Sequence, residues 1–505
     1  MNHSNADISN KDNLSERTNL RKFGSHLSSA FIAAIIARAL SLVLTKILTN
    51  ILPKAEFSSY SLWFALVTFL AVTSTSPYSA SLWRFMETRR LKSKKEAASL
   101  LSTSYFGGFL TLSICVLILY FSFFLFGFQI SIEPYYEISL AFSTFLASAL
   151  VLKEFILVVS GTEQNAREIV SYNLFFSILS TISSTLFVIF FNTSLSSLLG
   201  LGIGFSIPAM VALGIQLRRY GVERPQTTNL KISLRFGSPN LFVTSSSTVI
   251  PVLANYFVML LLGFDQISTL AIALTISSIL SLAIGPPFTA YQAYIINTFE
   301  NNCFDEARVL TEKLIILFVV LSGFFVIGMS VFASLIIEIL SSTAYLDAIA
   351  LVPLTVTSVA VIYLSYFWKL RIDLAERTEY TGAIHIVALG IFFALCPLLV
   401  SLIGLVGAAL ALLLNAFSIL ILTAIAGNKF YPIFVPKRIA ANLMISFIGC
   451  SVVYYLLTIQ GFLYPLPGIA CLCAFLLIVF GMRVVRVSEI RLILNMLFGR
   501  RDSNI

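Results

Sequence analysis

Long apolar segments alternate with short polar connections along the whole chain. Fourteen segments of roughly 20 residues are apolar enough to cross a bilayer as helices. Their approximate bounds are residues 27–51, 59–82, 98–128, 137–159, 168–191, 197–217, 237–263, 267–290, 309–333, 349–368, 380–400, 402–425, 439–459 and 463–482. No connection is long enough for a folded soluble domain. The pattern predicts an all-α polytopic membrane protein with about 14 transmembrane helices.

Basic residues follow the same alternation and predict the orientation. Of the 33 Lys and Arg residues, 30 belong to the N-terminal segment, the even-numbered connections or the C-terminal segment. Lys54 falls in an odd-numbered connection, and Arg38 and Lys46 lie inside the first apolar segment. Because short loops rich in Lys and Arg stay in the cytoplasm, both termini are expected to be cytoplasmic.

Composition changes this picture little. The 505-residue chain is 58% hydrophobic and 11% charged, with six Cys and a net charge of +9. Since the positive charges sit in short loops beside apolar segments, they indicate topology and contact with lipid headgroups, not nucleic acid. The Cys residues lack metal-ligand spacing and are interpreted as small apolar residues. The polar first 26 residues lack the features of a cleaved signal peptide, so the first span is expected to be retained. No nucleotide-binding, metal or nucleophile motif is present, so we expect no cofactor and no enzyme.

An internal repeat divides the chain. Short similar segments recur at an offset of about 204–210 residues and at matching places in the topology. They are Ser76–Ala80 with Pro286–Ala290, Glu56–Ser58 with Gln266–Ser268, and Ser197–Leu201 with Ser401–Leu405. Two blocks of six helices in the same orientation indicate a parallel repeat, as in rocking transporters. The predicted domains are a cytoplasmic tail (1–26), an N-lobe (27–217), a cytoplasmic linker (218–236), a C-lobe (237–425), two appended helices (426–482) and a second cytoplasmic tail (483–505).

Two cations inside the first segment are the strongest candidates for chemistry. Arg38 is about 17 Å into the span, and Lys46 lies about 12 Å further along the same broad face. A charge at mid-membrane costs at least ~2.5–3.5 kcal/mol and persists where it has a partner or a function. No Asp or Glu lies deep within a predicted span. An anionic ligand is therefore the favoured interpretation for Arg38, while Lys46 is close enough to the outer surface to snorkel.

Polar runs in other spans suggest either a hydrated cavity wall or helix packing. One run, residues 73–79, ends the second segment, and another, residues 238–248, opens the seventh and contains Asn240. Asn255 follows two turns later. Hydroxyl and amide side chains of this kind bond sugars in a wet cavity, or bond neighbouring helices. Arg84 adds a cation at the cytoplasmic mouth.

The chain resembles the polysaccharide transporter (O-antigen flippase) family of the multidrug/oligosaccharidyl-lipid/polysaccharide exporter superfamily. The resemblance covers nearly the whole chain and rests on the order and spacing of degenerate motifs: Arg38–Ser41 with Ile51–Leu62, Phe236–Asn240, Tyr345–Ala348 and Ile403–Leu410. It departs from the family where Ala254-Asn255 stands in place of a frequent Asp-Arg pair, and where Ser59 replaces a common Gly.

The resemblance implies a function. The substrate would be an oligosaccharide repeat unit on polyprenyl pyrophosphate, flipped from the inner to the outer leaflet of the bacterial inner membrane for O-antigen or lipopolysaccharide-like surface glycan. Arg38, Lys46 and Arg84 would meet the pyrophosphate, and Asn240 and Asn255 the sugars. Polysaccharide polymerase machinery is an implied partner, with membrane lipids around the tail.

Three rival interpretations remain. A cation-coupled multidrug exporter of the same superfamily would share the fold, but such exporters generally use membrane-embedded acids. A membrane glycosyltransferase or polymerase would need larger external loops than this chain has. A structural membrane protein would have no need of Arg38.

Overall fold

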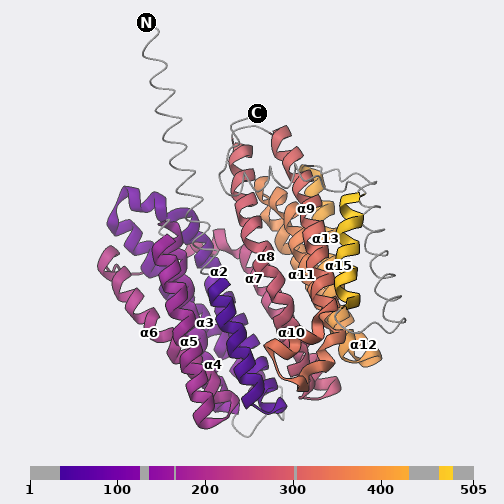
Figure 1. Cartoon of the computed structure of the whole chain (residues 1–505). Coiled ribbons are helices and arrows are strands. Elements are labelled where there is room, and N and C mark those ends of the chain that lie inside the picture. The colour runs from indigo at the N-terminus through magenta and orange to yellow at the C-terminus, as the bar shows by residue number, and fades with distance from the viewer. Residues whose placement is uncertain (1–34, 126–135, 164–165, 301–303, 432–465, 482–505) are drawn as a thin grey trace.

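The computed structural model describes residues 35–125, 136–163, 166–300, 304–431 and 466–481, and every regular element in these ranges is a helix. Residues 35–51 are helical and precede the labelled elements (Figure 1). In chain order these are α2 (Lys54–Lys92), α3 (Lys94–Leu125), α4 (Tyr136–Thr162), α5 (Ala166–Phe191), α6 (Ser194–Tyr220), α7 (Thr227–Leu262), α8 (Gln266–Glu300), α9 (Phe304–Val331), α10 (Ala333–Leu340), the 3-10 helix η1 (Thr343–Ala350), α11 (Val352–Leu374), α12 (Thr378–Ile403), α13 (Leu405–Phe430) and α15 (Leu466–Gly481). Ten helices in the described ranges are long and apolar enough to cross a membrane, and the bent pair η1–α11 gives an eleventh if it is one span. The chain is an all-α polytopic membrane protein, as predicted.

The helices coincide with the predicted spans but extend beyond them. The 39 residues of α2 cover about 58 Å, well beyond a hydrocarbon core of ~30 Å. Hydropathy detects only the apolar part of a helix. The charged end of α2, residues 83–92, contains no Gly or Pro, so the helix continues through it. The N-terminal tail 1–26, the predicted span 439–459 and the C-terminal tail 483–505 lie outside the described residues.

Two predicted connections are more ordered than hydropathy indicates. The predicted linker 218–236 is reduced to residues 221–226, since α6 ends at Tyr220 and α7 begins at Thr227. Gly221, at a φ of 84°, ends α6, and residues 227–236 then contain no helix breaker. Likewise, residues 333–350 form α10 and η1 where a loop was expected.

The helices form two groups with the same internal order (Figure 1). In the first, α4 packs against α2 and α6, and α5 against α6. In the second, α11 packs against α8 and α13, and α12 against α13. An offset of about 210 residues places each helix of the first group over its counterpart in the second. The parallel repeat that was predicted from short similar segments is therefore confirmed, because the two groups have the same helix order and the same helix packing.

Equivalent residues of the two repeats meet each other. The Ser58 hydroxyl donates to the Asp265 carbonyl (3.3 Å) and accepts from the Ser268 backbone N–H (3.1 Å). Ser58 and Ser268 are 210 positions apart, which is the repeat offset. A residue can contact its own counterpart only near the axis that relates the two repeats. This contact therefore marks where the pseudo-twofold axis passes, at the end of the bundle that the charge pattern predicts to be external. We call this the outer end, and the end carrying residues 84–95 and 218–235 the basic end.

Helix α7 joins the two groups. It packs along α2 of the first group and α12 of the second, and less extensively on α8. Close approach to α2 requires Gly237, where an added Cβ would lie 2.1 Å from the Pro77 carbonyl oxygen. Gly237 belongs to one of the motifs that carry the family resemblance, so its backbone contact gives that motif a structural reason.

Candidate functional site at the interface of the two groups

A seam of polar contacts joins α2 to α7 on the side of the basic end. Its hydrogen bonds are Thr73–Ser245 (3.1 Å), Ser76–Thr244 (2.7 Å), Ser76–Asn240 (3.2 Å), Ser81–Ser233 (2.8 Å) and Arg89–Asn229 (2.7 Å). These side chains include the two polar runs for which the sequence left a cavity wall and helix packing open. In this conformation the runs bond each other. Each such bond contributes roughly 0.5–1.5 kcal/mol. The seam adds these polar contacts to the apolar packing of the two helices, which includes the Phe85 and Phe236 rings at 5.3 Å.

At the outer end the cation Lys46 links the groups. Its ammonium donates to the carbonyl oxygens of Glu338 (2.7 Å) and Ser341, at the C-terminus of α10. Carbonyls at a helix C-terminus carry a partial negative charge and are unsatisfied within the helix, so a cation is favourable there. Lys46 therefore has protein partners in this conformation.

Two of the resemblance motifs also meet at the outer end. The Lys54 ammonium lies 5.5 Å from the centre of the Tyr345 ring, and the Phe57 and Tyr345 rings are 5.7 Å apart. Tyr345 is buried between them. In the same region the Glu56 carboxylate accepts from the backbone N–H of Ser194, at the N-terminus of α6, at 2.7 Å. The motifs thus pack the outer end of the interface.

Arg38 differs from the other cations of the interface. It is half-buried on the helix formed by residues 35–51, and no hydrogen bond or ion pair connects it to another residue of the described ranges. Lys46 is eight residues further along, or about 12 Å. Because Lys46 contacts α10 of the second group, this helix runs at the interface of the groups. Arg38 thus places a charge on the same helix, about 12 Å from Lys46 in the direction of the N-terminus.

The other predicted site residues lie apart. Arg84 is exposed on α2, and Asn240 is exposed on α7 while donating to Ser76. Asn255 is 3% exposed, and its carbonyl oxygen has no hydrogen-bond partner among the described residues. Within the described chain, no hydrogen bond joins any two of the five residues Arg38, Lys46, Arg84, Asn240 and Asn255. Their assignment to one substrate site remains a prediction.

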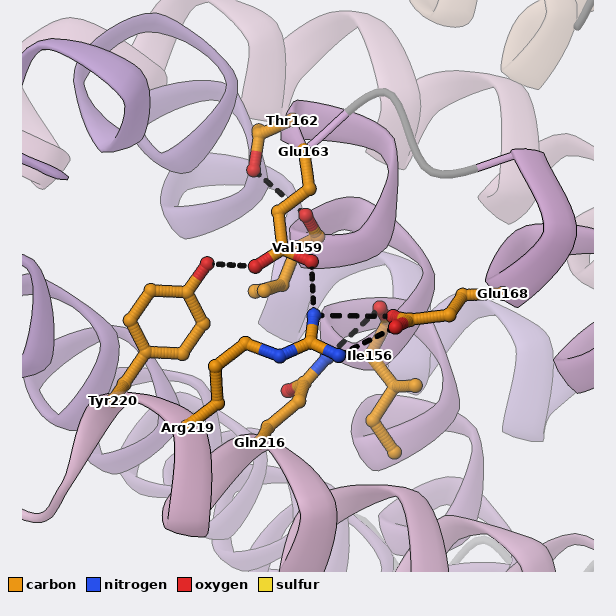
Figure 2. Close-up of polar contacts among 8 residues, drawn as sticks. All are labelled: Ile156, Val159, Thr162, Glu163, Glu168, Gln216, Arg219 and Tyr220. Atoms are coloured by element: carbon orange, nitrogen blue, oxygen red, sulfur yellow. Dashed lines mark hydrogen bonds and ion pairs between the residues drawn. The ribbon is translucent and has the colours of Figure 1, made fainter.

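A charged cluster at the basic end was not predicted (Figure 2). Arg219 on α6 forms ion pairs with Glu163, after α4, and with Glu168 on α5 (2.5 Å). The Tyr220 hydroxyl also donates to Glu163. One turn earlier, Gln216 donates to the Ile156 carbonyl of α4 (3.2 Å). The cluster fastens three helix ends of the first group. Sequence reasoning placed Glu163, Arg219 and Tyr220 in loops, where charges usually face water, and Glu168 and Gln216 at the ends of spans. No local spacing shows that these positions converge.

Among the residues that the structure describes, no group of three or more His, Cys, Asp or Glu side chains could hold a metal ion.

Comparisons with known proteins identify the fold. No family model matches the chain, and no curated protein sequence is significantly similar to it. Among solved structures, the lipid II flippase MurJ in an inward closed conformation is similar with a TM-score of 0.68 and 15% identity, covering 90% of this chain and 99% of its own. The chain shares the fold of this flippase structure. An inward-facing multidrug resistance MATE family transporter of the MOP superfamily gives 0.58 and 14%, covering 79% and 97%. A mutant of the Vibrio cholerae MATE transporter VcmN gives 0.57 and 14%, covering 82% and 98%.

Proposed function

We propose that this protein is a flippase for an oligosaccharide carried on polyprenyl pyrophosphate, moving it from the inner to the outer leaflet by alternating access. The setting would be the bacterial inner membrane with both chain termini cytoplasmic, and the product a unit of an O-antigen-like surface polysaccharide. Polysaccharide polymerase machinery would act on the unit after transport.

Arg38 is the observation that carries the proposal. A guanidinium in apolar surroundings needs an anion, and the described residues supply it with none. A pyrophosphate is a strong partner, because the planar guanidinium donates two parallel hydrogen bonds to phosphate oxygens. A neutral or cationic cargo would leave Arg38 without an anion among the described residues in this conformation.

The interface contacts support alternating access. Polar contacts lie at both ends of the interface: the α2–α7 seam towards the basic end, and Lys46 and Ser58 at the outer end, beside the Phe57–Tyr345 ring contact. Hydrogen bonds of this kind exchange with water at little net cost. Either end can therefore open while the other stays closed, which is the requirement for a carrier. The similarity to a lipid II flippase over 90% of the chain also favours a lipid cargo.

A cation-coupled multidrug exporter is the second candidate, because the MATE transporters share the fold. The two candidates require opposite charge at the cargo site. A flippase for an anionic pyrophosphate needs cations there, whereas exporters of cationic drugs generally rely on embedded acids.

Reconstituted protein distinguishes these functions. Proteoliposomes would be loaded with a fluorescent polyprenyl-pyrophosphate oligosaccharide in one assay and with a cationic dye under a Na⁺ or H⁺ gradient in another. We expect the lipid-linked sugar to become accessible to an external glycosidase at least tenfold faster than in empty liposomes, with no dye flux. Gradient-dependent dye flux without sugar flipping would replace the proposal with the exporter.

A further inference from the structure

Phe236 is an exposed aromatic residue at the edge of the α2–α7 seam. Its ring centre lies 5.3 Å from that of Phe85 on α2, and the ring planes meet at 66°, which is an edge-to-face contact. Phe85 is partly buried and packs against the hydrophobic core, whereas Phe236 is 46% exposed. The Phe236 ring is thus supported by α2 and still open to a ligand.

Polar side chains extend from Phe236 along one edge of α7. Asn240 and Ser247 are exposed and lie within about 40° of Phe236 around the helix. The Asn240 amide nitrogen donates to Ser76 at 3.2 Å, while its carbonyl oxygen forms no hydrogen bond with a described residue. The Ser247 hydroxyl donates to the Thr244 carbonyl at 2.7 Å and keeps its oxygen as an acceptor. The edge therefore presents an aromatic ring followed by two hydrogen-bond acceptors.

This edge is suited to water and not to lipid. Asn240 and Ser247 lie within the apolar span 237–263, where a position facing lipid tails would leave an amide oxygen and a hydroxyl without partners. Their exposure on the face that meets α2 places them beside the polar seam. Water or a polar ligand must satisfy them there.

A sugar ring matches this combination of groups. The C–H groups on its flat side pack on the electron-rich face of an aromatic ring, and the hydroxyls around its rim donate to acceptors. The other parts of the proposed cargo match it less well. A polyprenyl chain has no use for the acceptors, and a pyrophosphate requires donors or cations.

We infer that Phe236 stacks on a sugar of the cargo, with Asn240 and Ser247 bonding the sugar hydroxyls. The inference rests on the proposed flippase function and extends it, because it names a residue that selects the cargo by its sugars. Arg38 would meet the pyrophosphate, so the two parts of the headgroup would be recognised by different helices. Phe236 and Asn240 bound one of the motifs that carry the family resemblance, and stacking gives this motif a functional reason.

The test uses purified full-length protein and two lipids, polyprenyl pyrophosphate and polyprenyl pyrophosphate carrying the repeat unit from host cells. Native mass spectrometry measures the affinity for each lipid. The variant Phe236→Leu keeps an apolar side chain but loses the flat ring, and Phe236→Tyr keeps the ring.

Phe242→Leu is the matched control. Phe242 lies on the same helix, is 48% exposed and lies about 120° around α7 from Phe236. It is beside α12, where a Cβ added to Gly382 would lie 3.8 Å from the Phe242 Cβ.

We expect Phe236→Leu to bind the glycosylated lipid about tenfold more weakly than the wild type, which corresponds to one aromatic contact, and to bind the sugar-free lipid equally well. Phe236→Tyr and Phe242→Leu should match the wild type with both lipids. If Phe236→Leu fails to fold, Phe236→Met replaces it with the same expectation.

Three results would overturn the inference. Unchanged affinity of Phe236→Leu for the glycosylated lipid would show that the ring does not contact the sugar. An equal loss of affinity for both lipids would assign Phe236 a structural role. In either case binding of the glycosylated lipid by the wild type would leave the flippase proposal standing, whereas a wild type that binds neither lipid would contradict both.

Discussion

Cations in this protein show three ways of holding a charge within a membrane domain. Arg219 is neutralised by carboxylates of neighbouring helices. Lys46 is held by carbonyl oxygens at a helix C-terminus. Arg38 has no partner among the described residues. The sequence identified Arg38 and Lys46 because a charge in an apolar run is visible without a structure. It could not show that Lys46 finds carbonyls on α10, since that contact spans nearly 300 positions of the chain.

Replacement of Arg38 tests the anion site. Arg38→Ala should keep expression and folding but reduce export of the lipid-linked unit by at least 100-fold. A charge-assisted pair in a desolvated site contributes roughly 3 kcal/mol, which corresponds to that factor. Arg38→Lys keeps the charge but not the bidentate geometry and should retain part of the activity.

Export of the surface glycan in a complemented deletion strain provides the measurement, with Lys231→Ala, an exposed cation of α7, as the matched control. Wild-type export by Arg38→Ala would remove the basis for the anion site.

At the scale of the helices, the sequence was a good guide to where each one lies and a poor guide to what each one faces. Apolar length predicts a span whatever its neighbours are, so every predicted span in the described ranges contains a helix. Partners depend on which small or polar residues meet across helices. The polar runs of α2 and α7 were equally compatible with a wet wall, and only the structure shows that Ser76 bonds Thr244 and Asn240.

The tight contact of α7 with α2 makes a testable prediction. Gly237→Ala would place a Cβ about 2.1 Å from the Pro77 carbonyl oxygen, so the two helices must separate. Overpacking of this kind costs roughly 1–3 kcal/mol, and we expect a lower unfolding temperature and reduced transport. The control is Gly390→Ala in the middle of α12, where nothing lies within 4 Å of the added atom. That change should be neutral or slightly stabilising, because Ala favours helix over Gly by about 1 kcal/mol. Equal stability of the two variants in detergent would show that α2 and α7 do not pack this closely.

For the molecule as a whole, the repeat was the most useful feature of the sequence. A match of short segments such as Glu56–Ser58 and Gln266–Ser268 is a weak signal by itself. These two segments nevertheless locate the pseudo-twofold axis, where Ser58 contacts Asp265 and Ser268. The cluster around Arg219 could not be predicted from the sequence because it is assembled from the ends of three helices.

The contact between Ser58 and Ser268 lies at the outer end of the interface, which must open to release the substrate. Holding this contact closed should therefore stop transport. In a variant whose native Cys residues are replaced, Ser58→Cys with Ser268→Cys should cross-link on oxidation and stop transport, with recovery after reduction. Each single Cys variant should transport with or without oxidant. Flux that continues through fully cross-linked protein would contradict opening at this end.

The central claim is that the cargo is a polyprenyl-pyrophosphate oligosaccharide. Mass spectrometry of the polyprenyl-linked lipid pool in host cells depleted of this protein tests that claim most directly. We predict accumulation of a complete, unpolymerised repeat unit on polyprenyl pyrophosphate together with loss of the surface glycan, and the mass of the unit would give its sugars. An unchanged lipid pool with an intact surface glycan would contradict the claim.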